Sequence, residues 1–262
     1  MKKVLFTTVN GILKPFKGRG LSNTKIGKFV YEKMFIPNKP DYVNVEGFKL
    51  YLHKGGDLLS DSLLISKEYE PVETRVIKEL VNEGDIVVDA GANIGYYTVL
   101  MSKEVGPNGK VYAFEPGKEC FDILAKNVKE NNCNNVVLIN KAISDKEGEI
   151  KFYVNEKDKA SSSILEETKH LGKEVIVKAT TLDKEVIEDV DFMKMDIEGA
   201  ELGGLIGGKE LLQNCGKMVI EAPEDRRDFK DIEQVLLENK YRIERLDEGN
   251  IFCIKRKKED II

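Results

Sequence analysis

The stretch VVDAGANIGYYTVL, from Val87 to Leu100, decides the fold class of this chain. It begins as a short apolar run that ends in Asp89, passes through a glycine-bearing turn, and then takes up the periodicity of a helix. A strand, a tight turn and a helix N-terminus form the place where α/β sheets bind nucleotide-like ligands. A second strand, Val111 to Pro116 (VYAFEP), delivers Glu115 at its C-terminal end, where a carboxylate can accept both hydroxyls of a ribose. We therefore expect a cofactor that contains adenosine.

The spacing of the glycines favours S-adenosylmethionine over NAD as this cofactor. A dinucleotide fingerprint is G-x-G-x-x-G, and its middle glycine lets the backbone approach a pyrophosphate. Here Asn93 fills the middle position, and Asp89 would face a pyrophosphate with a negative charge. An acidic residue suits a ligand that carries an ammonium group and a sulfonium.

The composition is that of an ordinary globular protein. The 262 residues suffice for one large domain and a small appendage. The net charge of −5 argues against a general nucleic-acid binder. Four cysteines lie far apart with no C-x-x-C pair, which indicates reduced thiols in a cytoplasmic protein. No segment approaches the roughly 18 apolar residues that a membrane span needs.

The N-terminal stretch predicts a short helix, because its apolar residues from Leu5 to Phe16 fall on one helical face. We expect this helix to pack on the domain. A peripheral membrane contact, helped by Lys14, Lys17 and Arg19, is the alternative.

Strand and helix patterns alternate from Asp85 onward, which is the signature of a parallel sheet. Two further strands are expected around a polar insert from Asn155 to Gly172, and an antiparallel pair is expected to close the sheet. The predicted strands are Ile86–Asp89, Val111–Phe114, Val136–Ile139, Ile150–Val154, Val175–Ala179, Phe192–Met195, Met218–Glu221, Tyr241–Leu246 and Asn250–Ile254.

The predicted domain organisation has two parts. Residues 1–60 form an N-terminal helical appendage with a hairpin over Tyr42–Leu52, where residues alternate around Gly47. Residues 61–262 form the cofactor-binding domain.

A second dense patch is FMKMDIEGAE, Phe192 to Glu201, which places three carboxylates around a strand end. Asp196 marks the carboxyl edge of the sheet, where open α/β folds bind ligands. Glu198 and Glu201 can instead complement the dipole at the N-terminus of the following helix. Lys194 faces away from Met195 on a regular strand, and we assign it no catalytic role.

With these two patches the chain resembles the FkbM family of S-adenosylmethionine-dependent methyltransferases. The resemblance runs in the family's order over about residues 42–256, and the first forty residues fall outside it. The matching segments are EYEPVET (Glu68–Thr74), VVDAGANIGYYT (Val87–Thr98), AFEP (Ala113–Pro116), NKAISDKEG (Asn140–Gly148), TLD (Thr181–Asp183) and FMKMDIEGAE (Phe192–Glu201). Ala222-Pro223-Glu224 departs from the histidine-containing form of the family, which puts a family role for a histidine there in doubt.

The resemblance implies an α/β class I methyltransferase fold: a Rossmann-like, mostly parallel seven-stranded sheet with helices on both faces and a small N-terminal appendage. It also implies which residues hold the cofactor. Glu115 would take the ribose hydroxyls, and Asn140 and Ala142 would border the adenine. The methionine part would be held by Asp89, Gly91, Ala92, Asn93 and Gly95, and Glu70 would also face the cofactor.

Methyl transfer from a sulfonium is an in-line displacement, for which the protein aligns the reactants and excludes water. A sugar or alkyl hydroxyl needs a base or a metal to become a good nucleophile. We expect His53 and His170 at the surface, so the base is a carboxylate, Asp196 first and Glu198 second. A magnesium ion that bridges Asp196 and Glu198 is the variant that the sequence leaves open.

The functional hypothesis is an O-methyltransferase that acts on a hydroxyl of a sugar, glycan, glycolipid or small metabolite. An RNA or protein methyltransferase of the same fold is the alternative, with the basic stretch from Lys14 to Lys33 as a docking arm. The acidic net charge speaks against a stable nucleic-acid partner. A non-catalytic nucleotide- or NAD-binding module is the remote alternative. The sequence leaves the acceptor, the metal dependence and the oligomeric state open.

Overall fold

The structure is a computed structural model that describes residues 29, 31–155, 162–164, 170 and 172–256. Two compact units divide between Tyr69 and Glu70, and the expected boundary after residue 60 stays a prediction. The N-terminal helix with its membrane contact, most of the Lys14–Lys33 arm and most of the polar insert lie outside the described residues. Within the described part of the chain, no helix combines the length and the apolar character needed to cross a bilayer.

The first unit, Met1–Tyr69, contains the predicted hairpin. Strands β1 (Tyr42–Val45) and β2 (Phe48–Tyr51) pair antiparallel around Glu46 and Gly47. Both turn residues have positive φ angles, 52° and 76°, as a two-residue primed hairpin loop requires. The other described elements of this unit are η3 (Tyr31–Phe35), η4 (Ile36–Asn38) and α3 (Leu58–Ile65).

The expected surface position of one histidine is wrong. His53 is 2% exposed, because Leu52 and His53 both lie in the interior where the chain leaves β2 and the alternation of the hairpin ends. His170 is exposed, as predicted.

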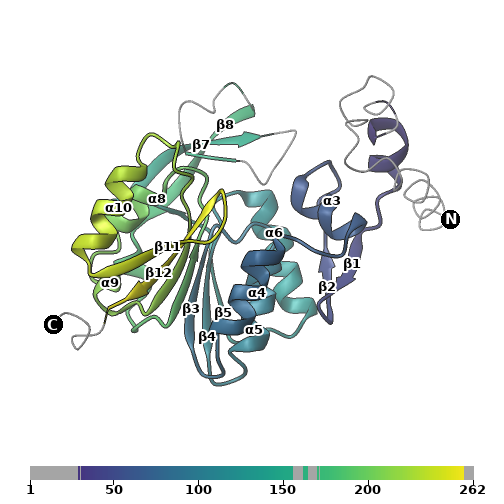
Figure 1. Cartoon of the computed structure of the whole chain (residues 1–262). Helices are drawn as coiled ribbons and strands as arrows, with labels where there is room; N and C mark the ends of the chain where they lie inside the picture. Colours follow the sequence, from purple (N-terminus) through teal and green to yellow (C-terminus); the bar gives the residue numbers. More distant parts are fainter. Residues whose placement is uncertain (1–28, 30, 156–161, 165–169, 171, 257–262) are drawn as a thin grey trace. The chain divides into compact units, whose positions relative to one another are not determined.

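The second unit, Glu70–Ile262, contains the predicted mostly parallel seven-stranded sheet (Figure 1). Every neighbouring pair in it is parallel except the two that involve β12, which runs antiparallel to both of its neighbours. The order across the sheet is β11 (Tyr241–Arg245), β12 (Asn250–Lys255), β10 (Lys217–Glu221), β9 (Phe192–Met195), β3 (Ile86–Ala90), β4 (Lys110–Phe114) and β5 (Val136–Ile139).

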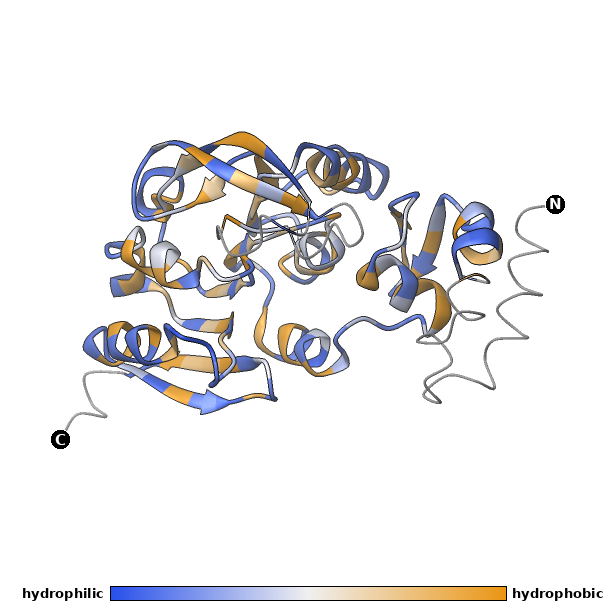
Figure 2. Ribbon diagram, turned by 90° about the horizontal axis from the view of Figure 1, so that it is seen from above, coloured by the Kyte–Doolittle hydropathy of each residue, from blue (hydrophilic) through white to orange (hydrophobic). Residues whose placement is uncertain are grey.

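Helices cover both faces of this sheet, as expected (Figure 1). One face carries α4 (Pro71–Leu80), α5 (Tyr96–Glu104) and α6 (Lys118–Glu130). The other carries α8 (Glu201–Ile206), α9 (Leu211–Asn214) and α10 (Phe229–Glu238). Hydrophobic and hydrophilic stretches alternate along the helices, which is typical of helices with one buried side (Figure 2).

Strand alternation sorts the side chains of the sheet between these two faces. Val88, Ala90, Met193 and Met195 belong to the apolar core with residues of α8, α9 and α10. The intervening residues Asp89 and Lys194 therefore point to the opposite face, and the parallel register pairs them directly. Two buried charged residues thus lie next to each other near the carboxyl ends of β3 and β9.

A separate three-stranded sheet contains both predicted extra strands. Its order is β6 (Ala142–Ile143), β8 (Gly172–Thr180) and β7 (Gly148–Asn155), and the short helix α7 (Leu182–Glu185) follows it. Ser163, in the described part of the insert, forms a bridge with Tyr153 of β7. Its hydroxyl donates to the backbone carbonyl of Glu198 at 2.6 Å, so this part of the insert contacts the DIEGAE turn.

Candidate active site

The turn after β3 consists largely of residues in left-handed conformations. Gly91, Asn93 and Gly95 have φ angles of 90°, 50° and 89°, and asparagine is among the few residues with a Cβ that tolerate this region. A Cβ at Gly91 would lie 1.8 Å from the backbone oxygen of Asp196. Because Gly91 has no side chain, the turn and the end of β9 lie directly against each other.

Glu115 connects this turn to the end of β4. Its Oε2 accepts a hydrogen bond from the Asn93 amide at 2.9 Å, and its Oε1 accepts one from the Gly117 amide at 2.7 Å. Burial raises the pKa of Glu115 to about 7. Each carboxylate oxygen has two lone pairs, so Glu115 retains the capacity to accept ribose hydroxyls. Asn140 lies beside it and donates to the Glu115 carbonyl at 2.7 Å, while Ala142 is buried in β6.

Asp89 is 1% exposed, and only one of its two carboxylate oxygens accepts a hydrogen bond from a described residue. Its Oδ2 accepts from the Thr98 hydroxyl at 2.5 Å, whereas no described residue donates a hydrogen bond to its buried Oδ1. Burial raises the pKa of Asp89 to about 6. A buried oxygen without a donor is costly. This atom therefore suits a ligand that brings a cationic donor, such as the ammonium group of a bound amino acid.

Glu70 reaches the same region from the start of α4. It adopts a left-handed conformation with φ 40° and accepts a hydrogen bond from the Tyr97 hydroxyl at 2.9 Å. The ammonium group of Lys194 lies 4.8 Å from the centre of the Tyr97 ring. Glu70, Tyr97 and Lys194 thus form one polar layer beside Asp89 on the α4–α6 face of the sheet.

A cavity of about 910 Å³ extends from Glu115 away from Asp89, between the edge strand β5 and the β7–β8 pair. Gly117 and Asn140 belong to its lining together with the apolar side chains of Cys120 and Phe152. Two residues expected around the cofactor, Glu115 and Asn140, therefore border a cavity whose wall is partly apolar.

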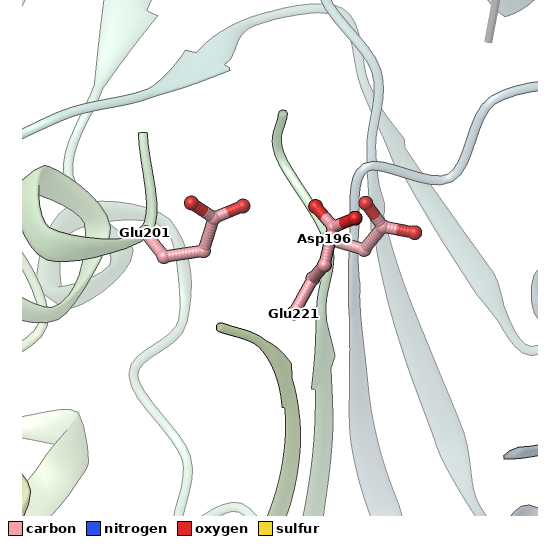
Figure 3. A group of neighbouring side chains, drawn as sticks. All are labelled: Asp196, Glu201 and Glu221. Carbon is pink, nitrogen blue, oxygen red and sulfur yellow. The ribbon is translucent and has the colours of Figure 1, made fainter. Parts of the chain in front are cut away.

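Three carboxylates converge at the ends of β9 and β10 (Figure 3). One oxygen each of Asp196, Glu201 and Glu221 lies within 4.8 Å of the others. The register of β10 against β9 pairs Ile220 with Met195, so Glu221 follows beside Asp196. Sequence reasoning missed Glu221, although its position at a strand end was a usable signal. Burial, with the charge of Asp196 next, raises the pKa of Glu221 and so favours its protonated form.

Two buried or half-buried cations lie against this cluster. Lys194, 4% exposed, donates to Oδ2 of Asp196 at 2.8 Å. Arg226 lies 2.6 Å from Oε2 of Glu201. The other oxygen of Glu201 accepts from the amides of Ile197 and Gly199 at 2.9 and 3.3 Å. Glu201 therefore holds the turn before α8.

The donor set does not fit the expected magnesium ion. Magnesium in proteins is held by one or two ionised carboxylates, and waters complete most of its octahedral shell. In the described cluster Asp196 and Glu201 already pair with Lys194 and Arg226, and burial favours the neutral form of Glu221 by raising its pKa. The carboxylates that converge are also not the expected pair of Asp196 and Glu198, but those of Asp196, Glu201 and Glu221. Glu198 has a positive φ of 54° in the turn that follows β9, and its charge acts on Glu221.

The raised pKa values of Asp89 and Glu115 predict a pH-dependent stability. An acid with a raised pKa stabilises the folded state fully below its unfolded pKa, near 4, and loses this contribution as the pH rises through its folded pKa, about 6 and about 7 here. We expect Asp89 and Glu115 together to lower the free energy of unfolding of the ligand-free protein by roughly 3 kcal/mol between about pH 5 and pH 8, and the raised pKa values of Glu73 and Glu221 to add to this fall. Urea denaturation across this range measures it. Asp89→Asn should reduce the slope, and a stability that rises with pH would contradict the assignment.

The sheet order with its one reversed strand, and the acidic residues at the ends of β3 and β4, define a class I methyltransferase fold. The model of the FkbM methyltransferase domain matches residues 89–243. The chain therefore belongs to the FkbM methyltransferase family, and the expected family is confirmed.

Individual relatives are also methyltransferases. The hexuronic acid methyltransferase AglP of Haloferax volcanii is 28% identical over 193 residues, which cover 71% of this chain and 76% of that protein. The methyltransferase sdnD of Sordaria araneosa is 29% identical over 157 residues, 47% of this chain and 60% of that protein. A crystal structure of an FkbM methyltransferase from Methylobacillus flagellatus is 15% identical, with a TM-score of 0.49, and the match covers 74% of this chain and 52% of that one.

Proposed function

We propose that this methyltransferase uses S-adenosylmethionine to methylate a hydroxyl of a sugar, glycan, glycolipid or small metabolite. The observation that carries the cofactor is the buried Asp89 Oδ1, to which no described residue donates. It lies one strand away from Glu115, at the edge where α/β sheets bind ligands. The sugar acceptor rests on the similarity to the hexuronic acid methyltransferase.

The proposed cofactor contacts follow the edge of the sheet. Asp89 and the turn from Gly91 to Gly95 would hold the methionine part, and Glu115 would accept the ribose hydroxyls. Asn140, Ala142 and the neighbouring cavity would receive the adenine, and Glu70 would face the cofactor from α4. When bound, S-adenosylmethionine supplies an electrophilic methyl group on a positively charged sulfur.

Asp196 is the proposed base. Its side chain is 24% exposed, so an acceptor hydroxyl can reach it, and Lys194 holds its Oδ2. A positioned carboxylate of this kind takes the hydroxyl proton as the new oxygen–carbon bond forms. Glu198, on the adjoining turn, remains the second candidate.

The cofactor is tested by calorimetric titration with S-adenosylmethionine and with NAD. We expect binding of S-adenosylmethionine alone, and loss of that binding in Asp89→Ala, because the ammonium group loses its buried partner. Thr98→Val is a matched control, since it removes the hydroxyl that occupies the other Asp89 oxygen and leaves the carboxylate in place. Binding of NAD, or undiminished binding by a folded Asp89→Ala, would refute the proposal.

The acceptor is tested by transfer of a labelled methyl group. Free hexuronic acids, their glycosides, neutral sugars and bulk tRNA are offered in parallel, and we expect label in a sugar fraction. Label in tRNA with none in the sugars would favour the RNA alternative. Cofactor binding with no label in any fraction would refute the sugar acceptor while leaving the cofactor assignment intact.

A further inference from the structure

Lys194 is a buried lysine with an unusual set of neighbours. It is 4% exposed and lies in the middle of the sheet, on β9. A lysine is almost never fully buried unless it is paired, because its charge loses the solvation of water. Its ammonium group donates to Asp196 Oδ2 at 2.8 Å and lies over the ring of Tyr97.

Negative charges surround Lys194 from several elements. Asp89 is its direct neighbour on β3, and Glu70 acts on it from the start of α4. These carboxylates, with Asp196, raise the pKa of Lys194 even though burial alone would lower it. The lysine therefore stays charged throughout the physiological pH range.

We propose that Lys194 is a positioning residue of the methyl-transfer site. Its ammonium group fixes the orientation of the Asp196 carboxylate and balances the negative charge of Asp89. It supplies the positive charge that a metal ion would otherwise provide there. The proposal rests on the proposed function, because it assigns Lys194 a role between the cofactor side and the acceptor side of that site.

Geometry supports this role. Asp196 directly follows β9 and is two residues from Lys194, and the two side chains meet at 2.8 Å. The ammonium group holds one oxygen of Asp196, which restricts the rotation of the carboxylate and leaves its other oxygen for an acceptor. Asp89 of β3 is paired with Lys194 in the register of the sheet and lies on the proposed cofactor side. The buried charge of Lys194 therefore acts on both the cofactor side and the acceptor side of the site.

The test compares S-adenosylmethionine with S-adenosylhomocysteine, which lacks the positive charge on sulfur. Both are titrated into the wild type, Lys194→Arg, Lys194→Gln and Lys194→Met. Removal of one positive charge should raise the affinity for the charged ligand relative to the neutral one by roughly tenfold, because the ammonium group of Lys194 no longer repels the sulfonium. We expect this change in the Gln and Met variants, and a wild-type ratio in Lys194→Arg.

Crystal structures of the Gln and Met variants test the positioning itself. Glutamine retains a donor for Asp196 and should keep its side chain in place, whereas methionine has no donor and should release it. An unchanged affinity ratio in folded Gln and Met variants would overturn the proposal, and so would an unmoved Asp196 in the Met variant. A wild type whose S-adenosylmethionine affinity changes between excess chelator and added magnesium would also overturn it. A wild type that binds neither ligand would instead refute the proposed function.

Discussion

Asp196→Asn should lower kcat for methyl transfer by about 10²- to 10⁴-fold, the contribution typical of a positioned general base. Asparagine has nearly the same shape and can still accept the hydrogen bond from Lys194. It cannot take a proton from an acceptor hydroxyl. The affinity for S-adenosylmethionine should fall by no more than the roughly tenfold that the loss of one nearby charge causes, which is far less than the loss in kcat. Initial rates at saturating acceptor, with a parallel calorimetric titration, separate the two effects.

Two further variants make this experiment decisive. Glu198→Gln tests the second candidate base, and a larger loss of kcat in it than in Asp196→Asn would exchange the two roles. Asp225→Asn removes an exposed acid from the loop after β10 and controls for the loss of one negative charge. Full turnover in both Asp196→Asn and Glu198→Gln would show that neither carboxylate is the base.

Gly91→Ala should destabilise the protein by more than about 4 kcal/mol, enough to unfold many domains of marginal stability. The new Cβ would lie 1.8 Å from the backbone oxygen of Asp196. No rotamer change can relieve this collision, because the obstacle is backbone. The Asp196 amide is itself bonded to the Ala90 carbonyl at 2.9 Å, so the end of β9 cannot withdraw without breaking the sheet. Urea denaturation or the soluble yield of the variant measures the effect.

Gly84→Ala is the matched control. Gly84 has the same φ angle as Gly91, 90°, but a Cβ there would meet nothing within 4 Å. We expect it to cost only about 1–2 kcal/mol, the strain of a left-handed residue with a side chain. Equal losses in the two variants would mean that the close approach of the turn to β9 does not contribute to stability.

The proposed contact between cofactor and Asp89 has a consequence for the pH dependence of stability. A cation bound at the Asp89 carboxylate favours its ionised form. Saturation with S-adenosylmethionine should therefore reduce the fall in stability toward alkaline pH that the ligand-free protein shows. Asp89 and Glu115 thus destabilise the ligand-free protein at alkaline pH, and the same two residues are proposed to bind the cofactor.

Local patterns were sufficient to predict most of the fold. Each strand of the seven-stranded sheet is a short apolar run bounded by turn residues, and the turn at Gly91 was recognisable from its glycines and Asn93. Strand ends lie at one edge of a parallel sheet, so the edge positions of Asp89, Glu115 and Asp196 followed from the order of strands and helices. Their individual roles stay predictions until ligands are titrated.

Local sequence patterns could not predict which side chains contact one another in the site. The hairpin suggested an exposed His53, yet the path of the chain after β2 buries it. Lys194 was assigned no role, because a lysine on a predicted strand does not reveal which residues its neighbours bring to it. The sequence predicts magnesium between Asp196 and Glu198 from two nearby acids, but the three carboxylates that converge are those of Asp196, Glu201 and Glu221.

The sequence by itself determined the type and order of the elements and the acids at the strand ends, because these depend on periodicity and on residues close together in the chain. Only the tertiary structure decided that Lys194 lies beside Asp89, that Glu221 lies beside Asp196, and that Arg226 neutralises Glu201. The register between parallel strands is set by packing across long connections, and the net charge of a buried site depends on all the residues that this packing brings together.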